Sequence, residues 1–191
     1  MSSFFAMLSR MKYIDRWALM RNTTRENISE HSLEVAFLAH ALALIGNRRL
    51  GKQLDSARCA LLGMYHDTTE ILTGDMPTPV KYKDDGIREA YRHIETQAAE
   101  NLLSRLPDDL REEYRPFYEP REEDSYLWRI VKAADKLSAL IKCMEELKAG
   151  NTEFRSAAAS THEKLTEMAL PEADIFMADF LEDFGKTLDE L

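Results

Sequence analysis

Apolar side chains recur at helical spacing along most of the 191-residue chain, whereas the alternation typical of strands is nearly absent. The pattern predicts a short helix after the turn at 106–109 and longer helices over 4–14, 29–45, 55–72, 87–106, 125–149, 152–168 and 171–188. Glycines at 46, 74 and 150 are expected to end three of them. No linker interrupts the series, so residues 1–191 are predicted to form one all-α domain.

Two segments do not fit a helical pattern. The first, 15–28, follows the first expected helix and carries Arg16, Trp17, Arg21 and Arg25. The second, 75–79, contains two prolines, which lack an amide donor and fix φ, so it cannot continue the preceding helix. The helix expected at 29–45 is different again, because apolar residues lie on two of its sides. A helix of that kind is usually central to the fold.

Charge and composition limit the range of partners. A domain of this length buries about 70% of the surface of its unfolded chain, so its core needs no disulfide or metal to hold it together. The formal net charge of −9 argues against binding a nucleic-acid polymer, which requires local positive charge to displace counterions. The negative net charge is still compatible with a small anionic ligand that a few local cationic side chains bind.

Cysteine usage and the N-terminal sequence predict a soluble cytoplasmic protein. Cys59 and Cys143 are too few and too far apart for a disulfide framework or a zinc ribbon, so both are expected to be reduced core thiols. Residues 1–12 lack a signal-peptide core, because Ser9 and Arg10 interrupt their apolar positions. No apolar run approaches the roughly 20 residues that span a bilayer, so no membrane partner is expected.

Ionisable side chains gather near the end of the helix expected at 55–72. His66 and Asp67 are adjacent, and Glu70 follows one turn later. At about 100° per residue, an ion lying off the helix surface could be reached by both His66 and Asp67. Glu70 would then face that ion or a water bound to it. Gly63, one turn before His66, would let another helix approach closely.

A His-Asp pair alone is weak evidence for a metal site, but other expected helices supply suitable partners. His31 lies in the first turn of the helix at 29–45. Asp135 lies at the edge of the apolar face of the longest helix, where an unpaired carboxylate would be costly to bury. Two imidazoles and two carboxylates suit Mn, Fe, Co, Ni or Zn, with open positions for water.

These residues also resemble a known signature. His31, His66-Asp67 and Asp135, on separate helices, are similar to the H…HD…D pattern of HD-domain phosphohydrolases. Further stretches narrow the resemblance to the bacterial YfbR-type 5'-deoxynucleotidases: Arg16-Trp17, the sequences SEHSL at 29–33, MYHD at 64–67, TGDMPTPVKY at 73–82 and EEL at 145–147. The resemblance covers most of the chain and weakens after about residue 150.

The resemblance implies a fold, an activity and a cofactor. The fold would be an HD-domain helical bundle of about seven helices, and the protein would assemble as a homodimer. The activity would be hydrolysis of deoxyribonucleoside 5'-monophosphates to deoxynucleoside and phosphate. One divalent metal ion, such as Co, Mn or Zn, would be held by His31, His66, Asp67 and Asp135.

The resemblance further implies roles for residues around that ion. Glu70 and Asp67 match the catalytic acidic residues, and Arg16 matches the phosphate contact. Trp17 matches the residue that crowds the sugar and disfavours a ribose 2'-hydroxyl. The implied substrate contacts are Arg16, Trp17, His31, Asp67, Asp75, Met76, Pro77 and Thr78.

Elementary chemistry agrees with this function but leaves alternatives. Phosphoryl transfer requires positioning and charge stabilisation, which one metal ion and Arg16 could supply. Glu70 could act as a base, an acid or an orienting group. The same metal site could serve another nucleotide, such as a nucleoside triphosphate, a cyclic dinucleotide or an alarmone, or it could be vestigial in a non-catalytic helical interaction module. Among the other histidines, His40 is expected in the core, whereas His93 and His162 are expected in solvent.

Overall fold

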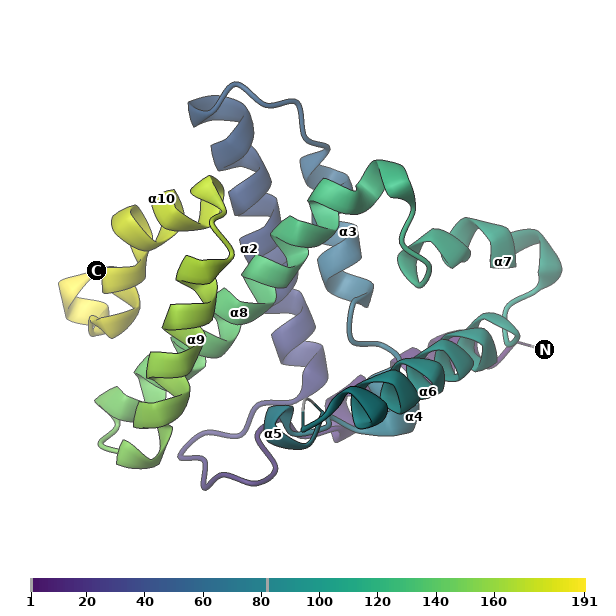
Figure 1. The fold of residues 1–191 in the computed structure, drawn as a ribbon, viewed down its shortest axis with the longest axis horizontal. Helices are drawn as coiled ribbons and strands as arrows, with labels where there is room; N and C mark the ends of the chain where they lie inside the picture. The colour runs from purple at the N-terminus through teal and green to yellow at the C-terminus, as the bar shows by residue number, and fades with distance from the viewer. Residues whose placement is uncertain (1, 82) are drawn as a thin grey trace. The chain divides into compact units, whose positions relative to one another are not determined.

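The computed structural model describes residues 2–81 and 83–191, and in them the regular secondary structure is helical (Figure 1). The α-helices are α1 (Phe4–Leu8), α2 (Ile28–Arg49), α3 (Ser56–Tyr65), α4 (Glu70–Thr73), α5 (Thr78–Lys81), α6 (Asp85–Leu103), α7 (Asp108–Tyr114), α8 (Ser125–Lys148), α9 (Arg155–Glu167) and α10 (Pro171–Phe180). Short 3-10 turns join several of them. Extended pairing within the described residues is limited to an isolated bridge between Asp15 and Asn27. The all-α prediction is confirmed.

The chain divides into two compact units. One comprises Met1–Arg21, Arg25–Ser32 and Tyr65–Arg121, and the other comprises Asn22–Thr24, Leu33–Met64 and Glu122–Leu191. Two of the boundaries, after Ser32 and after Met64, fall inside α2 and α3, so the chain passes between units there within regular helices. The single domain over residues 1–191 stays a prediction.

In the first unit, α1 and α4 lie beside the long helix α6 (Figure 1). Phe4 of α1 is fully buried and packs with Leu102, Leu103 and Leu106 at the end of α6. A hydrogen bond of 3.2 Å between the Thr73 and Tyr91 hydroxyls links α4 to the middle of α6. These contacts fix the position of α4, which begins with Glu70.

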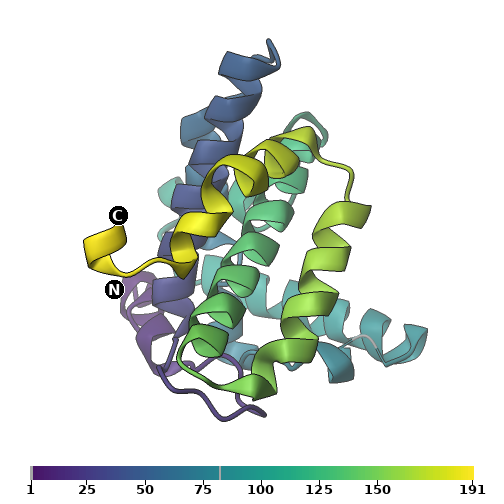
Figure 2. The same cartoon turned by 90° about the vertical axis from the view of Figure 1, so that its left-hand side faces the viewer.

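In the second unit, α8 and α9 lie side by side, and α10 also packs against α8 (Figure 2). Helices α2 and α3 meet at Gly63, where an added Cβ atom would lie 3.0 Å from Ala36 Cα. The sequence-based expectation that Gly63 permits a close helix approach is therefore confirmed. The buried core here includes Leu42, Leu62 and Leu137.

Helix α2 is one residue longer at its start, and four longer at its end, than the expected range. Its N-cap is Asn27, not Ser29, because Asn27 Oδ1 accepts from the Ser29 and Glu30 backbone N–H groups at 3.0 and 3.1 Å. Gly46 does not end the helix. A Cβ atom there would lie 2.8 Å from Glu172 Oε1, so glycine at this position serves packing.

The helix expected at 55–72 is two helices, because α3 ends at Tyr65 and α4 begins at Glu70. The Thr68 side chain explains the break. Its hydroxyl donates to the Tyr65 carbonyl at 2.8 Å, and its backbone N–H donates to the same carbonyl at 3.2 Å. That local bonding replaces the helical pattern, so His66 and Asp67 lie in a turn. Gly74, with φ of +73°, follows α4 as expected.

The second apolar side of α2 is exposed, which corrects the expectation that both sides are buried. Leu33, Phe37 and Leu44 are 50%, 67% and 40% exposed. His40 lies on the same side and is also exposed, so the prediction of a core histidine is wrong. The opposite side, with Val35, Leu38, Leu42 and Ile45, is buried as expected.

By length and composition alone, α2 could cross a bilayer. The most apolar 18-residue window of its 22 residues has a mean hydropathy of 1.3. However, 56% of that window is buried inside the protein, as in the core helix of a globular protein. The buried side of α2 therefore accounts for its apolar composition.

Candidate active site

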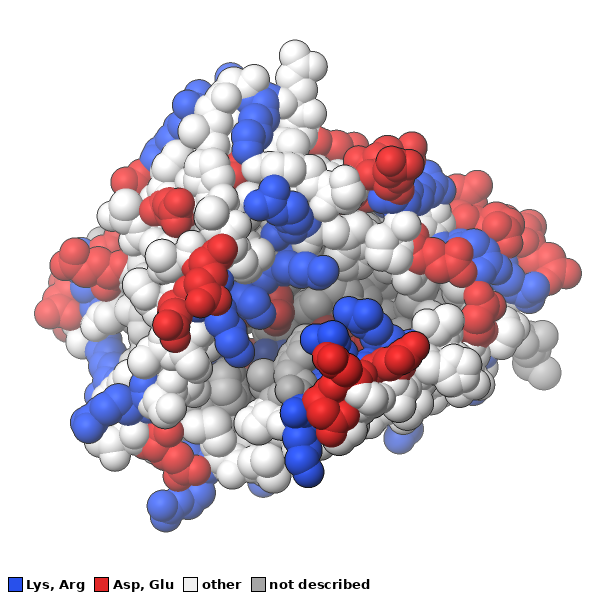
Figure 3. Space-filling model, viewed as in Figure 1, with Lys and Arg blue, Asp and Glu red and all other residues white. Residues whose placement is uncertain are grey.

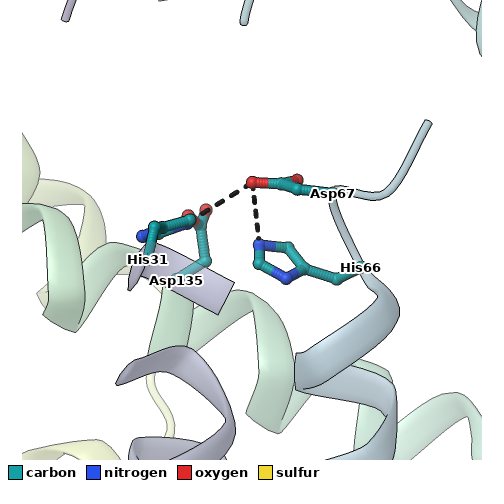
Figure 4. Close-up of side chains that lie close together, drawn as sticks. All are labelled: His31, His66, Asp67 and Asp135. Atoms are coloured by element: carbon teal, nitrogen blue, oxygen red, sulfur yellow. Dashed lines mark ion pairs between the residues drawn. The ribbon is translucent and has the colours of Figure 1, made fainter. Parts of the chain in front are cut away.

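The turn between α3 and α4 brings His66 and Asp67 together. His66 Nε2 lies 3.0 Å from Asp67 Oδ2, and Nε2 of His31 lies 3.4 Å from the same oxygen (Figure 4). His31 comes from the first turn of α2, where its side chain is fully buried. The two imidazole rings are 5.2 Å apart between centroids. Two ring nitrogens thus converge on one carboxylate oxygen.

Asp135 of α8 belongs to the same group of side chains. One ligand atom from each of His31, His66, Asp67 and Asp135 lies within 4.8 Å of the others (Figure 4). Asp135 is half-buried, in agreement with its expected place at the edge of the apolar face. The structure therefore brings together the four residues that the sequence singled out as metal ligands.

The way in which His66 and Asp67 converge differs from the sequence-based expectation. On a continuous helix their directions would diverge by about 100°. In the turn that follows Tyr65, both side chains instead reach one point. The assignment of these two residues as metal ligands stays a prediction, whereas the expected continuous helix is wrong.

The electrostatic environment keeps Asp67 ionised. Burial raises the pKa of its carboxyl, but the electrostatic attraction of the nearby His66 and His31 imidazoles outweighs that effect. The pKa of Asp67 is therefore well below its usual value. An anionic carboxylate beside two imidazole nitrogens is a suitable donor set for Mn, Fe, Co, Ni or Zn, so the residues present fit a divalent transition metal.

The pKa of Glu70 is shifted in the opposite direction from that of Asp67. Burial raises the pKa of its carboxyl to about 9, and the negative charges of Asp67 and Asp75 add to this, against the lowering effect of Arg16 and Lys81. The Oε2 atom is buried and has no hydrogen-bond partner among the described residues. Burial and the two neighbouring carboxylates therefore favour the protonated form of Glu70, which lies among charged groups that a phosphate-binding site would use.

Arg16 and Trp17 lie in the segment between the first short helices and α2, as expected. Arg16 Nη1 lies 3.4 Å from Asp67 Oδ2, which places the guanidinium next to the candidate metal ligands. The Trp17 backbone N–H donates to Asp75 Oδ2 at 3.3 Å. Trp17 also has a φ of +59°, a left-handed conformation that is costly for a bulky residue.

The segment between α4 and α5 carries the remaining predicted substrate contacts. Asp75 is brought to Trp17 by the hydrogen bond described above, and burial raises the pKa of its carboxyl. Met76 and Pro77 follow it and are half-buried. Thr78 begins α5, but its side chain lies outside the part of the chain that the structure describes. The structure thus connects Asp75 to Trp17, and the substrate-binding roles of all four residues stay predictions.

One residue that sequence reasoning did not identify joins this group. Glu26 Oε2 accepts a hydrogen bond of 2.8 Å from Trp17 Nε1 and lies 3.4 Å from Arg16 Nε. Its other oxygen, Oε1, lies 3.6 Å from His31 Nδ1. The only sequence signal for Glu26 is its place immediately before Asn27 and the start of α2. Periodicity could not assign a direction to a residue in an irregular segment.

Comparison with known families agrees with this geometry. Residues 3–184 match the family described as 5'-deoxynucleotidase YfbR-like. The chain belongs to this family. Among its relatives, the 5'-deoxynucleotidase PBPRA2627 of Photobacterium profundum is 50% identical over 192 aligned positions, which cover 100% of this chain and 98% of the relative. The resemblance inferred from sequence motifs is confirmed, and it extends beyond residue 150.

Solved structures show that this YfbR-like chain has the HD-domain fold. An HD-domain phosphohydrolase from Listeria innocua superposes with a TM-score of 0.83 at 22% identity, covering 95% of this chain and 88% of that one. The HD phosphohydrolase DatZ of cyanophage S-2L, solved with dA and one catalytic Zn²⁺ ion, has a TM-score of 0.65 at 19% identity and covers 95% and 96%. The predicted HD-domain bundle is confirmed.

Proposed function

We propose that this YfbR-like protein is a metal-dependent 5'-deoxynucleotidase that hydrolyses deoxyribonucleoside 5'-monophosphates to deoxynucleoside and phosphate. The observation that carries the proposal is the convergence of the His31, His66, Asp67 and Asp135 ligand atoms within 4.8 Å, in a chain of this family. We assign these four residues as the ligands of one divalent ion, such as Zn, Co or Mn. When bound, such an ion lowers the pKa of a coordinated water and offsets charge on the phosphoryl group.

The protein's own side chains supply the remaining requirements of phosphoryl transfer. Arg16, 3.4 Å from Asp67, binds the phosphate with its permanently charged guanidinium. Asp67 is assigned a second role beside it, in positioning the phosphate. Glu70 lies close to these groups and exchanges a proton with the attacking water or with the departing 5'-oxygen. The reaction forms one P–O bond to water and breaks the P–O bond to the sugar.

The sugar and base are assigned to the neighbouring segments. We place the deoxyribose against Trp17, whose indole is held by Glu26 and whose backbone N–H is held by Asp75. A fixed aromatic ring at this position excludes a ribose 2'-hydroxyl by steric contact. Asp75, Met76, Pro77 and Thr78 would then line the rest of the nucleotide, with His31 beside the phosphate.

A mononucleotide agrees better with the surface charge than a polymer does. Acidic and basic side chains are interspersed on the face shown in Figure 3, and the net charge is −9. A nucleic-acid polymer would need a broad basic surface, whereas a mononucleotide needs only a local cationic site. We therefore assign the protein a small cytoplasmic substrate, with neither a nucleic-acid polymer nor a membrane as partner.

Release of phosphate from a panel of nucleotides tests the function. With added Zn²⁺, Co²⁺, Mn²⁺ or Mg²⁺ in parallel, deoxyribonucleoside 5'-monophosphates are expected to be hydrolysed faster than ribonucleoside 5'-monophosphates, nucleoside triphosphates or cyclic dinucleotides. Excess chelator should abolish release. No release from any monophosphate with any of the four metals would contradict the proposal and favour a non-catalytic module.

The same panel tests the role of Trp17. Trp17→Ala is expected to lower the ratio of kcat/KM for deoxyribonucleotides to kcat/KM for ribonucleotides, because it removes the ring that excludes the 2'-hydroxyl. Loss of discrimination by a single steric contact is on the order of 10- to 100-fold. Leu19→Ala, at an exposed position of the same segment, is the matched control and should leave the ratio unchanged. An unchanged ratio in Trp17→Ala would remove Trp17 from sugar selection.

We also propose that the protein assembles as a homodimer through the exposed side of α2. Support comes from Leu33, Phe37 and Leu44, which lie at helical spacing and are at least 40% exposed, since side chains of this kind often mark an interface. Phe37→Glu is expected to convert a dimer to monomers in light scattering coupled to gel filtration. His40→Glu should do the same less completely, and a monomeric wild-type protein would contradict the assignment.

A further inference from the structure

Glu26 lies at the base of the segment that carries Arg16 and Trp17. The Asp15–Asn27 bridge closes this segment. Next to the bridge, the Arg16 backbone N–H donates to the Glu26 carbonyl at 2.9 Å, and the Ile28 N–H donates to the Ile14 carbonyl at 3.0 Å. The backbone of Glu26 is thereby fixed directly opposite Arg16. Its side chain needs little further ordering to reach the residues around it.

The first contact of the Glu26 carboxylate is with His31. Oε1 lies 3.6 Å from His31 Nδ1, an ion-pair distance somewhat longer than a hydrogen bond, while Nε2 of the same ring faces Asp67 Oδ2 at 3.4 Å. Histidines that bind metals through one nitrogen usually direct the other nitrogen to a carboxylate or carbonyl. That partner favours a proton on Nδ1 and leaves the Nε2 lone pair available for the ion.

The second oxygen of Glu26 contacts the residues assigned to the substrate. Oε2 accepts from Trp17 Nε1 at 2.8 Å and lies 3.4 Å from Arg16 Nε. The pair is shielded from solvent, with side-chain exposures of 11% for Arg16 and 12% for Glu26. At such burial an ionic contact is stronger than the same contact in water. One carboxylate therefore contacts a metal ligand, the phosphate-binding cation and the sugar-excluding ring.

We propose that Glu26 is a positioning residue, which orients the His31 imidazole for metal binding and holds Arg16 and Trp17 in their places for substrate. Glu26 does not contact the ion or the reacting atoms itself. The inference rests on the proposed metal-dependent function, but its first consequence is a change in metal affinity. That quantity can be measured without substrate.

Glu26→Gln and Glu26→Ala separate the two parts of this role. Gln keeps the size of the side chain and an oxygen that accepts from Trp17 Nε1, but it removes the charge that faces His31. Glu26→Gln is therefore expected to weaken zinc affinity by about 10- to 100-fold, measured by competition with a chromophoric chelator, with the deoxy-to-ribo preference retained. Glu26→Ala is expected to weaken zinc affinity as much and also to narrow that preference.

Glu30→Gln is the matched control. Glu30 lies in the first turn of α2, is exposed and accepts a hydrogen bond from the Asn27 backbone N–H, which glutamine can also accept. The zinc affinity of Glu30→Gln should equal that of the wild-type protein. Far-UV circular dichroism checks that each variant is folded. If Glu26→Ala does not fold, the isosteric Glu26→Gln still tests the proposal.

Two results would overturn the inference: an unchanged zinc affinity in Glu26→Gln, or an equal loss in Glu30→Gln. Both are independent of the reaction. If the wild-type protein binds zinc but releases phosphate from no monophosphate, the proposed function fails while the zinc affinities still decide the role of Glu26. If the wild-type protein hydrolyses deoxyribonucleotides and Glu26→Gln binds zinc normally, only the role of Glu26 fails.

Discussion

Glu70→Ala is expected to lower kcat on deoxyribonucleoside monophosphates by about 100- to 10,000-fold, the range typical of a lost proton-transfer group. Zinc affinity should stay close to that of the wild-type protein, because Glu70 is not among the four convergent ligand residues. Steady-state kinetics at saturating metal, together with zinc competition measurements, check both parts. Retained turnover would remove Glu70 from the mechanism.

Glu70→Gln distinguishes two ways in which Glu70 could act. Glutamine has nearly the same shape and can hydrogen-bond to a water, but it cannot exchange a proton. If Glu70 transfers a proton, Glu70→Gln should be as inactive as Glu70→Ala. If it only orients the water, Glu70→Gln should recover much of the lost kcat. The comparison requires that both Glu70→Ala and Glu70→Gln bind zinc, which the zinc competition measurement checks.

His66→Ala is expected to abolish activity by a different route. It removes one of two imidazoles that face Asp67 Oδ2, so zinc affinity should fall by more than the roughly 10- to 100-fold typical of losing a residue that only supports a ligand. Raised metal concentration should restore part of the activity of His66→Ala and none of the activity of Glu70→Ala. Metal content after gel filtration and a metal titration of kcat provide the measurements.

His93→Ala is the matched control for this experiment. His93 lies on α6, is exposed and pairs with Gln97 at 3.0 Å. Its replacement should change neither metal content nor activity. Full zinc affinity in His66→Ala, or an equal loss in His93→Ala, would contradict the assignment of His66 as a ligand.

Periodicity was sufficient to predict the helices whose apolar face is continuous. The range 125–149 corresponds to α8 at Ser125–Lys148 within one residue, because a long single stripe leaves little freedom in placing the helix. Asp135 could be placed at the edge of that stripe for the same reason. The four proposed metal ligands were identified from residue chemistry and a family signature.

Other features depend on contacts that a linear pattern does not contain. The end of α3 at Tyr65 is set by the hydrogen bonds of Thr68, which a run of helix-forming residues does not show. The exposure of Phe37 and His40 depends on which side of α2 is covered, and both sides are apolar. The place of Glu26 follows from the Asp15–Asn27 bridge between two irregular stretches.

The interruption of the helix after Tyr65 has a consequence for protein design. On an uninterrupted helix, a grafted His-Asp pair would direct its two side chains about 100° apart. The imidazole would then not approach the neighbouring carboxylate oxygen as His66 Nε2 approaches Asp67 Oδ2 here, at 3.0 Å. A transplanted site would therefore need Thr68, or another side chain that can cap the preceding turn, as much as it needs the two ligands. A design that transfers this site would therefore have to include the end of the first helix and the following turn, because the His-Asp dipeptide alone would not reproduce the geometry.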